Sequence, residues 1–373
     1  MGKPIKVLHV IDKFSMDGTN PSSCSRLFAE WIPRHDASRF QVEVAGLRPP
    51  DPASEFLQQH DMRVHHIDKG KISPKIITEI EKIAVTGGFH ILHLHGYSSA
   101  NFGRMAAKRA KIRSIVHEHA ILKIQPHQFL VDRLLRGKND VGIAVSQAVK
   151  EFMIQGRSVP ADKIRVIWNG VRLQDFQNIP PEKISAFRAK HNIPTEKRII
   201  GTVTRLREEK GNAFLVEAAA RVCKDFEDVV FVLVGDGPDR ERLEKQAQNL
   251  GVSDKVIFTG FEPEIAPALG AMEVVAIPSL NEGFGLAMVE AMAAGKPVVA
   301  SRVGGMLEIA EHEETALFVP PANAEKLADA LSRLLQDGDF AGKIKENAMR
   351  RSLDFGIEKN VAALEKLYQG MMS

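Results

Sequence analysis

The stretch "SLNEGFGLAMVEAMAAGKPVVAS", from Ser279 to Ser301, joins a glycine-broken turn, an apolar helical segment and a short strand. Glycines adopt backbone angles that other residues avoid, so the backbone of "EGFG" can approach a ligand closely. The segment "LAMVEAMAAG" is apolar on most of its surface, as buried helices are, and Gly295 ends it. The stretch therefore predicts an α/β unit with a ligand-facing turn.

Strands and helices continue to alternate on both sides of this stretch. Such alternation predicts parallel sheets that are covered by helices on both faces. Strands are expected at 5–11, 40–46, 63–67, 90–96, 113–119, 140–146, 164–170, 198–206, 228–237, 255–261, 272–279, 296–301 and 315–321. Helices are expected at 22–34, 74–85, 101–110, 147–155, 211–223 and 239–250, and from residue 324 onward.

The alternation is interrupted between Leu173 and Lys197, where three prolines occur. A chain of 373 residues is also longer than a single core usually allows, which is about 250–300 residues. We expect an α/β protein of two Rossmann-like domains that face each other across a cleft, since ligands bind at the carboxyl ends of such strands. The expected parts are domains 1–172 and 198–355, a connection at 173–197, and a C-terminal helix at 356–373 that crosses back to the first domain.

The bulk composition is that of an ordinary globular protein, with 44% hydrophobic and 26% charged residues. The chain has no run of 18 apolar residues, so no membrane span is expected. Lys3 and Lys6 are followed by only five apolar-leaning residues before Asp12, which suits a first strand better than a signal peptide. Cys24 and Cys223 indicate no disulfide framework, and we expect a cytoplasmic protein, with peripheral binding to the inner face of the membrane as a further option.

Charge is unevenly distributed along the chain. Residues 1–175 carry 26 Lys and Arg against 17 Asp and Glu, a net of +9, whereas the remainder has a net of −6. A basic half indicates an anionic partner, and a basic face without a partner is the alternative. We expect an anionic membrane surface or a lipid-linked acceptor, and no nucleic acid. The candidate contacts are Arg104, Lys108, Arg109, Lys111 and Arg113 in 103–113, and Lys123, Ile124, Phe129, Leu130, Arg133, Leu134, Leu135, Arg136 and Lys138 in 122–138.

Two basic residues follow the first predicted strand of the second domain, in "TRLREEKG". Arg205 and Lys210 are five residues apart, and Gly211 precedes a helix. Two cations beside the unpaired N–H groups of a helix N-terminus form a favourable phosphate site. The alternative is a solvated loop that holds two of the chain's 50 basic residues.

Two acids, Glu282 and Glu290, flank the turn and the start of the helix in the opening stretch. Carboxylates accept hydrogen bonds from vicinal hydroxyls, and the helix N-terminus near Leu286 favours an anion. Cations for phosphate and acids for hydroxyls are the parts of a nucleotide-sugar site. The alternative is that Glu290 is one more exposed helical residue.

The motif "NEGFGLAMVEAMAAGKPVVAS" resembles the donor-binding signature of retaining glycosyltransferases of family four, which have the GT-B fold. "TRLREEKG", "FVLVGDGPDRERLEKQAQNLGVSDKVIFTGF", "VGGMLEI" and "IRVIWNGVRLQDF" are similar to successive motifs of that family, and "HILHLHG", "VHEHA" and "AVSQAV" match it more loosely. The resemblance covers essentially the whole chain. It implies transfer of a sugar from a nucleotide-diphosphate sugar, expected to be a UDP-sugar, to a lipid-linked, glycan or small-molecule acceptor.

The resemblance also implies roles for individual residues. Cations would hold the diphosphate, Glu290 the ribose and Glu282 the transferred sugar, beside which His119 would lie. The first loop, "DGTNPSS", departs from the family because it has Thr19 where a second glycine is usual. The implied catalytic residues are His119, Glu282, Arg205 and Lys210. The implied donor contacts are Gly18, Thr19, Arg205, Lys210, Glu282, Gly283, Phe284, Gly285, Leu286 and Glu290.

Paired histidines leave an alternative function open. "HLH" and "HEH" each place two imidazoles on one face of a strand, because side chains alternate with a period of two. His93, His95, His117 and His119 are therefore the candidate ligands of a metal-dependent hydrolase. No well-placed Asp or Cys completes the set, and we expect no metal and no cofactor. A non-catalytic protein that binds nucleotide sugars is the other alternative.

Overall fold

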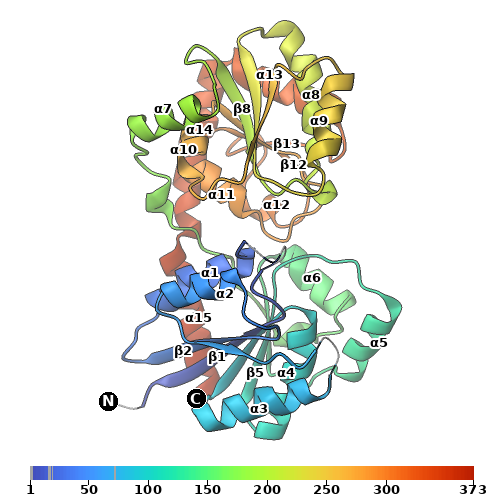
Figure 1. Cartoon of the computed structure of the whole chain (residues 1–373), viewed down its shortest axis with the longest axis vertical. Coiled ribbons are helices and arrows are strands. Elements are labelled where there is room, and N and C mark those ends of the chain that lie inside the picture. The colour runs from blue at the N-terminus through green and yellow to red at the C-terminus, as the bar shows by residue number, and fades with distance from the viewer. Residues whose placement is uncertain (1–2, 16–17, 19, 71–72) are drawn as a thin grey trace. The chain divides into compact units, whose positions relative to one another are not determined.

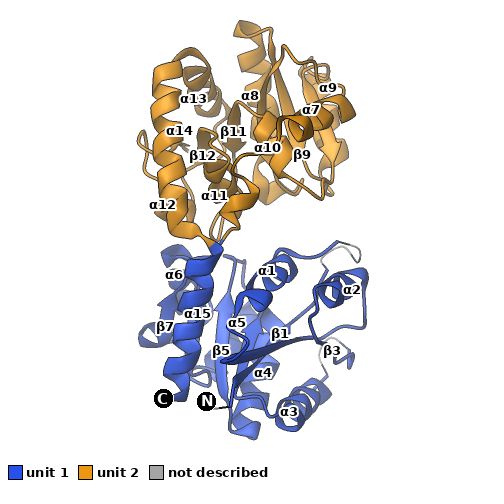
Figure 2. Cartoon of the chain, turned by 90° about the vertical axis from the view of Figure 1, so that its left-hand side faces the viewer, with its two compact units in different colours: residues 1–170, 357–373 blue, residues 171–356 orange. Residues whose placement is uncertain are grey.

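The structure is a computed structural model that describes residues 3–15, 18, 20–70 and 73–373. The chain divides into two compact units (Figure 2). Unit 1 comprises residues 1–170 and 357–373, and unit 2 comprises residues 171–356. The segment expected to connect the domains, 173–197, lies within unit 2 and contains helix α7 (Pro181–Lys190).

Unit 1 contains a seven-stranded parallel sheet with the order β3-β2-β1-β4-β5-β6-β7 (Figure 1). The strand order reverses between β1 and β4, and this point is where open α/β sheets place ligands. The strands are β1 (Ile5–Ile11), β2 (Phe40–Gly46), β3 (Val64–His66), β4 (Ile91–His95), β5 (Arg113–Glu118), β6 (Val141–Ala144) and β7 (Ile164–Val166).

The helices of unit 1 are α1 (Ser23–Trp31), α2 (Pro52–Gln59), α3 (Lys75–Gly87), α4 (Tyr97–Ala110), α5 (Pro126–Leu134), α6 (Gln147–Gln155) and α15 (Ile357–Met372). Local sequence explains several of their starts. The side chains of Ser22, Asp51 and Ser146 accept hydrogen bonds from the backbone at the first turns of α1, α2 and α6. Helix α4 begins four residues before its predicted start, and α2 was not predicted.

Helix α15 closes the chain and belongs to unit 1. The Glu365 carboxylate accepts the backbone N–H of Asp36 at 2.8 Å and lies 3.2 Å from Nδ1 of His35. Asn360 donates to the carbonyl of Trp168, and the side chain of Tyr368 is fully buried. The last helix therefore contributes both polar contacts and core to the first sheet.

Unit 2 contains a six-stranded parallel sheet with the order β10-β9-β8-β11-β12-β13, so its switch point lies between β8 and β11. Its strands are β8 (Arg198–Val203), β9 (Val229–Val234), β10 (Val256–Gly260), β11 (Val274–Ile277), β12 (Val298–Ser301) and β13 (Leu317–Val319). Besides α7, its helices are α8 (Asn212–Asp225), α9 (Arg240–Asn249), α10 (Ala266–Ala271), α11 (Leu286–Ala293), α12 (Met306–Ile309), α13 (Ala324–Gln336) and α14 (Gly338–Ser352). Strands such as "VVFVLV" are buried throughout because helices cover both faces of the sheet.

Among the described residues, no helix combines the length and the hydropathy that crossing a membrane requires.

Candidate functional site

The loops that follow β8 and β11 meet at the switch point of unit 2. The backbone N–H of Leu280 donates to the carbonyl of Glu209 at 2.9 Å, which joins the two loops directly. Gly211 has φ of +65°, and a Cβ atom at this position would lie 1.9 Å from the carbonyl oxygen of Pro278. Only glycine permits both the backbone angle and the contact. The sequence "EKG" therefore brings Lys210 against the turn that begins the opening motif.

The loop after β12 fixes the same turn from its other side. Gly304 has φ of +52°, and a Cβ there would lie 1.8 Å from the carbonyl oxygen of Glu282. The N–H of Gly305 donates to that oxygen at 3.2 Å. Three loops thus hold the backbone of Glu282 at the carboxyl edge of the sheet.

The side chains of Lys210 and Glu282 form an ion pair across these loops. Lys210 Nζ lies 2.5 Å from Glu282 Oε1, and the Ser279 hydroxyl donates to the same oxygen at 3.0 Å. The side chains remain 26% and 15% exposed, so both are accessible to a ligand. The structure therefore brings together two residues that the sequence assigned to different parts of a donor molecule.

The remaining candidate residues of unit 2 lie close to Lys210 or to Glu282 in the sequence. Arg205 is exposed in the loop after β8, which ends at Val203. Helix α11 begins at Leu286, and Glu290 is half-buried in its second turn. Gly283 and Gly285 are buried in the turn. The Phe284 ring is also buried, with its centroid 5.8 Å from that of Phe355, so Phe284 offers a ligand its backbone only.

The first loop of unit 1 is described in part. Gly18 is exposed and its N–H donates to the Ser15 hydroxyl at 2.8 Å, whereas Thr19 lies outside the described residues. Asp12, directly after β1, accepts the N–H groups of Ser98 and Ser99 at 3.0 and 2.5 Å. This carboxylate therefore occupies the N-terminus of α4, where an anion is favoured.

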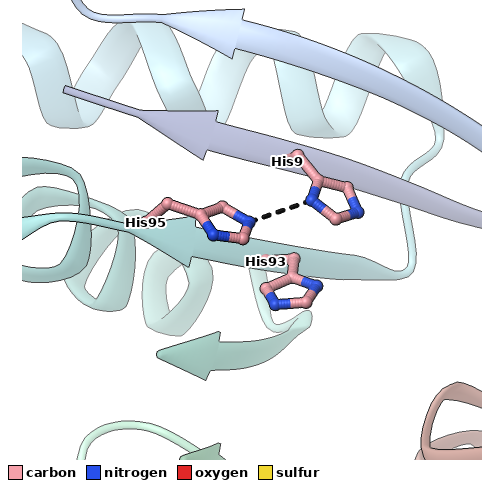
Figure 3. Close-up of side chains that lie close together, drawn as sticks. All are labelled: His9, His93 and His95. Carbon is pink, nitrogen blue, oxygen red and sulfur yellow. Dashed lines mark hydrogen bonds between the residues drawn. The ribbon is translucent and has the colours of Figure 1, made fainter. Parts of the chain in front are cut away.

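His119 directly follows β5 and ends a chain of hydrogen bonds within unit 1. Its Nε2 lies 2.9 Å from Nδ1 of His95. Figure 3 shows the next bond of the row, between His95 and His9, in which Nε2 of His95 lies 2.9 Å from Nδ1 of His9. His9 Nε2 lies 3.3 Å from the Tyr368 hydroxyl, which is 2.7 Å from Nδ1 of His93. His93 Nε2 then contacts Nδ1 of His117 at 3.0 Å. This row of hydrogen bonds joins β1, β4, β5 and α15.

Two members of this chain, His9 and Tyr368, were not among the predicted residues. His9 had a signal in the sequence, because "VLHVI" places an imidazole in a buried strand as "HLH" does. Its partner in the β1–β4 register is His93, which brings the two rings to a centroid distance of 4.4 Å. Tyr368 had no comparable signal: the C-terminal helix was expected to return to the first domain, but nothing in its sequence indicates which of its side chains meets the histidines.

Burial keeps these imidazoles neutral. It lowers the pKa of His9, His93, His95 and His117 well below 6.5, and the neighbouring histidines lower it further. Burial lowers the pKa of His119 to about 4 and raises that of the Tyr368 phenol. Among the described residues, two sets have nitrogen atoms within 4.8 Å of one another, as metal ligands require: His9 with His93 and His95, and His95 with His117 and His119.

A buried ion-pair network lies beneath helix α5 and corrects one expectation. Asp132, fully buried, lies 2.8 Å from Arg104 Nη2 and 2.8 Å from Arg157 Nε, and Arg157 lies 2.6 Å from Glu118. Arg104 is therefore not a surface contact, as the sequence suggested, because it neutralises a buried carboxylate. Leu135 is also buried. The other basic candidates of 103–113 and 122–138 are exposed.

Both halves of the chain resemble known glycosyltransferases. Residues 25–175 match the model of the family "Glycosyltransferase Family 4", and residues 183–351 match that of "Glycosyl transferases group 1". A glycosyltransferase of Methanocaldococcus jannaschii is 36% identical over 56% of this chain and 54% of its own. The D-inositol 3-phosphate glycosyltransferase of Corynebacterium urealyticum is 32% identical over 62% of this chain and 57% of its own. The chain thus spans about half the length of such relatives.

Solved structures match over nearly the whole chain. The Anabaena protein HepE, in complex with UDP, has a TM-score of 0.87 at 24% identity and covers 98% of this chain and 100% of its own. Sucrose-phosphate synthase from Thermosynechococcus elongatus has a TM-score of 0.82 at 22% identity and covers 98% and 99%. These likenesses show the fold, whereas the family models show the relationship. The first half of the chain thus belongs with Glycosyltransferase Family 4 and the second half with glycosyl transferases group 1, and the two parallel-sheet units have the GT-B fold.

Proposed function

We propose that this protein is a retaining glycosyltransferase that uses a UDP-sugar as donor. The observation that carries the proposal is the Lys210–Glu282 ion pair at the switch point of unit 2, beside the N-terminus of α11. It places a cation for phosphate and an acid for hydroxyls within one contact. UDP is the nucleotide bound by the Anabaena protein of similar fold, and retention is the outcome that the sequence motif implies.

The donor would replace protein contacts with ligand contacts at this pair. Lys210 and Arg205 bind the diphosphate, and the α11 N-terminus adds partial positive charge. Glu282, released from part of its bond with Lys210, accepts hydroxyls of the transferred sugar, while Glu290 accepts those of the ribose. As the bond from the anomeric carbon to the diphosphate breaks, its electron pair leaves with the diphosphate, and the same cations stabilise that charge. The acceptor hydroxyl forms the new bond to the anomeric carbon, and its proton passes to an oxygen of the departing diphosphate.

The experiment is a thermal-shift panel of nucleotides and nucleotide sugars, followed by an assay for UDP release. A true ligand at 100 times its Kd stabilises a protein by about 2.7 kcal/mol. We expect UDP and at least one UDP-sugar to shift the melting temperature, and slow UDP release without acceptor. Binding without any release would instead support a non-catalytic binding protein. The family assignment gives the hydrolase alternative no support.

We further propose that the acceptor side of unit 1 works at an anionic membrane surface. Helix α5 carries this proposal, because its one buried side chain is an aspartate while its apolar side chains face outward. Leu130 is 57% and Leu134 70% exposed. Apolar side chains that are flanked by Lys and Arg suit insertion among lipid headgroups, at about 1 kcal/mol for each basic residue near the surface. The exposed apolar residues are Leu122, Phe129, Leu130, Val131 and Leu134, and the flanking exposed cations are Lys123, Arg133, Arg136 and Lys138.

Co-sedimentation with vesicles tests this second part. We expect binding to anionic vesicles at low salt, weak binding to neutral ones, and loss by about 0.5 M salt as the Debye length shrinks. Leu134→Ser should weaken binding, whereas Leu250→Ser, which changes a 41% exposed leucine of unit 2, should not. Protein that stays in the supernatant at low salt would point to a soluble acceptor such as a small phosphorylated molecule.

A further inference from the structure

Five imidazoles and one phenol of unit 1 form a single hydrogen-bonded row, and the number of protons in the row limits how its members can donate. A neutral imidazole has one N–H and one lone pair, and a phenol can donate one hydrogen bond while it accepts another. Burial holds all six groups in these neutral forms. The six groups therefore hold six protons, and five hydrogen bonds join them in a row.

Each of the five hydrogen bonds contains one proton, so the sixth proton is on the nitrogen at one end of the row. Because each imidazole donates from one nitrogen and accepts at the other, all donors must point the same way along the row. The end atoms are His117 Nε2 and His119 Nδ1, both buried and without a hydrogen-bond partner among the described residues. One of them carries a proton whenever the other carries a lone pair. The tautomer of His119 is thus linked to that of His117.

The rings are held too firmly to escape this link by rotating. Trp31 stacks on His117 with centroids 5.7 Å apart and planes at 4°, and on His119 at 6.1 Å and 27°. Phe28 packs edge-on against His9 and His95 at 5.2 and 4.9 Å. A flipped ring would present carbon to a hydrogen-bond partner, which is costly for a buried polar group.

The Tyr368 hydroxyl is the junction of the row, since it alone connects His9 to His93 in the hydrogen-bonded order. Without it, His119, His95 and His9 would form one group, and His93 with His117 another, each free to choose its direction. We propose that Tyr368 is a positioning residue whose hydroxyl makes a single donor direction run through all five histidines and so links the tautomer of His119 to that of His117. The value of that tautomer for sugar transfer rests on the proposed function, whereas the link itself does not.

The same count says what a metal ion would require of this row. A cation bound by both end nitrogens would need a lone pair at each, so its binding would release one proton from the row. Without a cation, one end nitrogen is a donor and the other is an acceptor.

The test is ¹⁵N NMR of protein labelled in its histidine imidazoles, without substrate, with single-histidine variants for assignment. In the unaltered protein, the protonated fractions at His119 Nδ1 and His117 Nε2 should sum to one. Tyr368→Phe keeps the ring but removes the hydroxyl, and should change the tautomer populations of His119. The matched control is Tyr97→Phe, since Tyr97 is the other tyrosine of the chain and its hydroxyl donates to the Gln128 carbonyl outside this network.

Activity supplies a second readout. Tyr368→Phe should lower kcat by about tenfold with unchanged UDP affinity, because a misplaced group impairs the reaction and not donor binding in unit 2. Fractions that do not sum to one, or unchanged His119 tautomers in Tyr368→Phe, would overturn the proposal even if the variant is inactive. Altered tautomers with unchanged kcat would confirm the link and overturn the role of His119 in transfer. The measurement on the unaltered protein stands even if the variant does not fold.

Discussion

The two units are open parallel sheets of similar design, but they fill the carboxyl edge near the switch point differently. Unit 2 fills it with backbone, because Gly211 and Gly304 bring one loop's Cα against another loop's carbonyl. Unit 1 fills it with imidazoles, which are joined by hydrogen bonds. The backbone contacts that join the loops of unit 2 do not titrate and leave no space for a Cβ atom at Gly211 or Gly304, whereas the hydrogen bonds among the histidines of unit 1 depend on their protonation state. The predictions below follow from this difference.

The largest effect is expected from a side chain on the backbone-built edge. Gly211→Ala places a Cβ 1.9 Å from the Pro278 carbonyl at a positive φ, so the loops must separate. We expect a loss of about 4 kcal/mol or more in the unfolding free energy of unit 2, the range reserved for severe strain, and loss of UDP binding. Gly251→Ala is the matched control, since Gly251 has φ of +69° and no atom within 4 Å of its Cβ position. Equal effects of the two changes, measured by urea unfolding, would show that the contact is unimportant.

A smaller effect is expected when the cations of the same edge are removed. Lys210→Ala and Arg205→Ala should each lower kcat/KM by about 10²–10³, or 2.7–4 kcal/mol, as the loss of one group that stabilises developing charge does. Lys210→Ala also removes the ion-pair partner of Glu282, and we expect the conformation of the turn around Glu282 to change as a result. The double variant should cost less than the sum of the two changes if both cations bind one diphosphate. Strict additivity in steady-state kinetics would indicate separate roles.

Glu290→Gln tests the acid on α11 and is expected to be milder. The change retains shape but removes the charged acceptor for ribose hydroxyls, at about 1.5–3 kcal/mol of binding free energy. The fold should be intact, because Glu290 is half-buried and lies on a short helix with a well-packed apolar face. Isothermal titration with UDP measures the loss. An unchanged Kd would remove Glu290 from the donor site.

The imidazole-built edge predicts acid sensitivity of unit 1. The pKa values of its five linked histidines are depressed in the folded state, so their contribution to stability is present above pH 6.5 and is lost as the pH falls below it. For His119 the loss extends down to pH about 4, its folded pKa. Each histidine lowers the unfolding free energy by up to about 1.4 kcal/mol per pH unit in this window.

Tryptophan fluorescence isolates this effect, since both tryptophans, Trp31 and Trp168, lie in unit 1. Urea midpoints followed by fluorescence should fall between pH 7.5 and 5.5. The exposed His127 is the control position, and His127→Gln should leave the dependence on pH unchanged. A midpoint that does not change over this range would mean that the histidines are not held neutral by the fold.

Much of the fold was predictable because it depends on local patterns. Every predicted strand contains or closely overlaps an observed one, since buried parallel strands are short apolar runs between turn residues. The opening stretch forms its turn, α11 and β12 as expected. The strand predicted at 198–206 ends early, at Val203. Arg205 belongs instead to the loop after β8, which is hydrogen-bonded to the loop after β11. Local pattern does not indicate where pairing between strands stops.

What the sequence determined by itself is the order of elements, the two sheets and the residue types at their edges, because periodicity and glycine positions are properties of neighbouring residues. The tertiary structure alone decided which side chains meet. Arg104 and Lys108 look alike in sequence, yet Arg104 is buried because Asp132, 28 residues later, lies against it. Lys210 contacts Glu282 across 72 residues, and Tyr368 reaches His93 across 275. Contacts at such separations depend on strand order and helix packing, which no local pattern encodes.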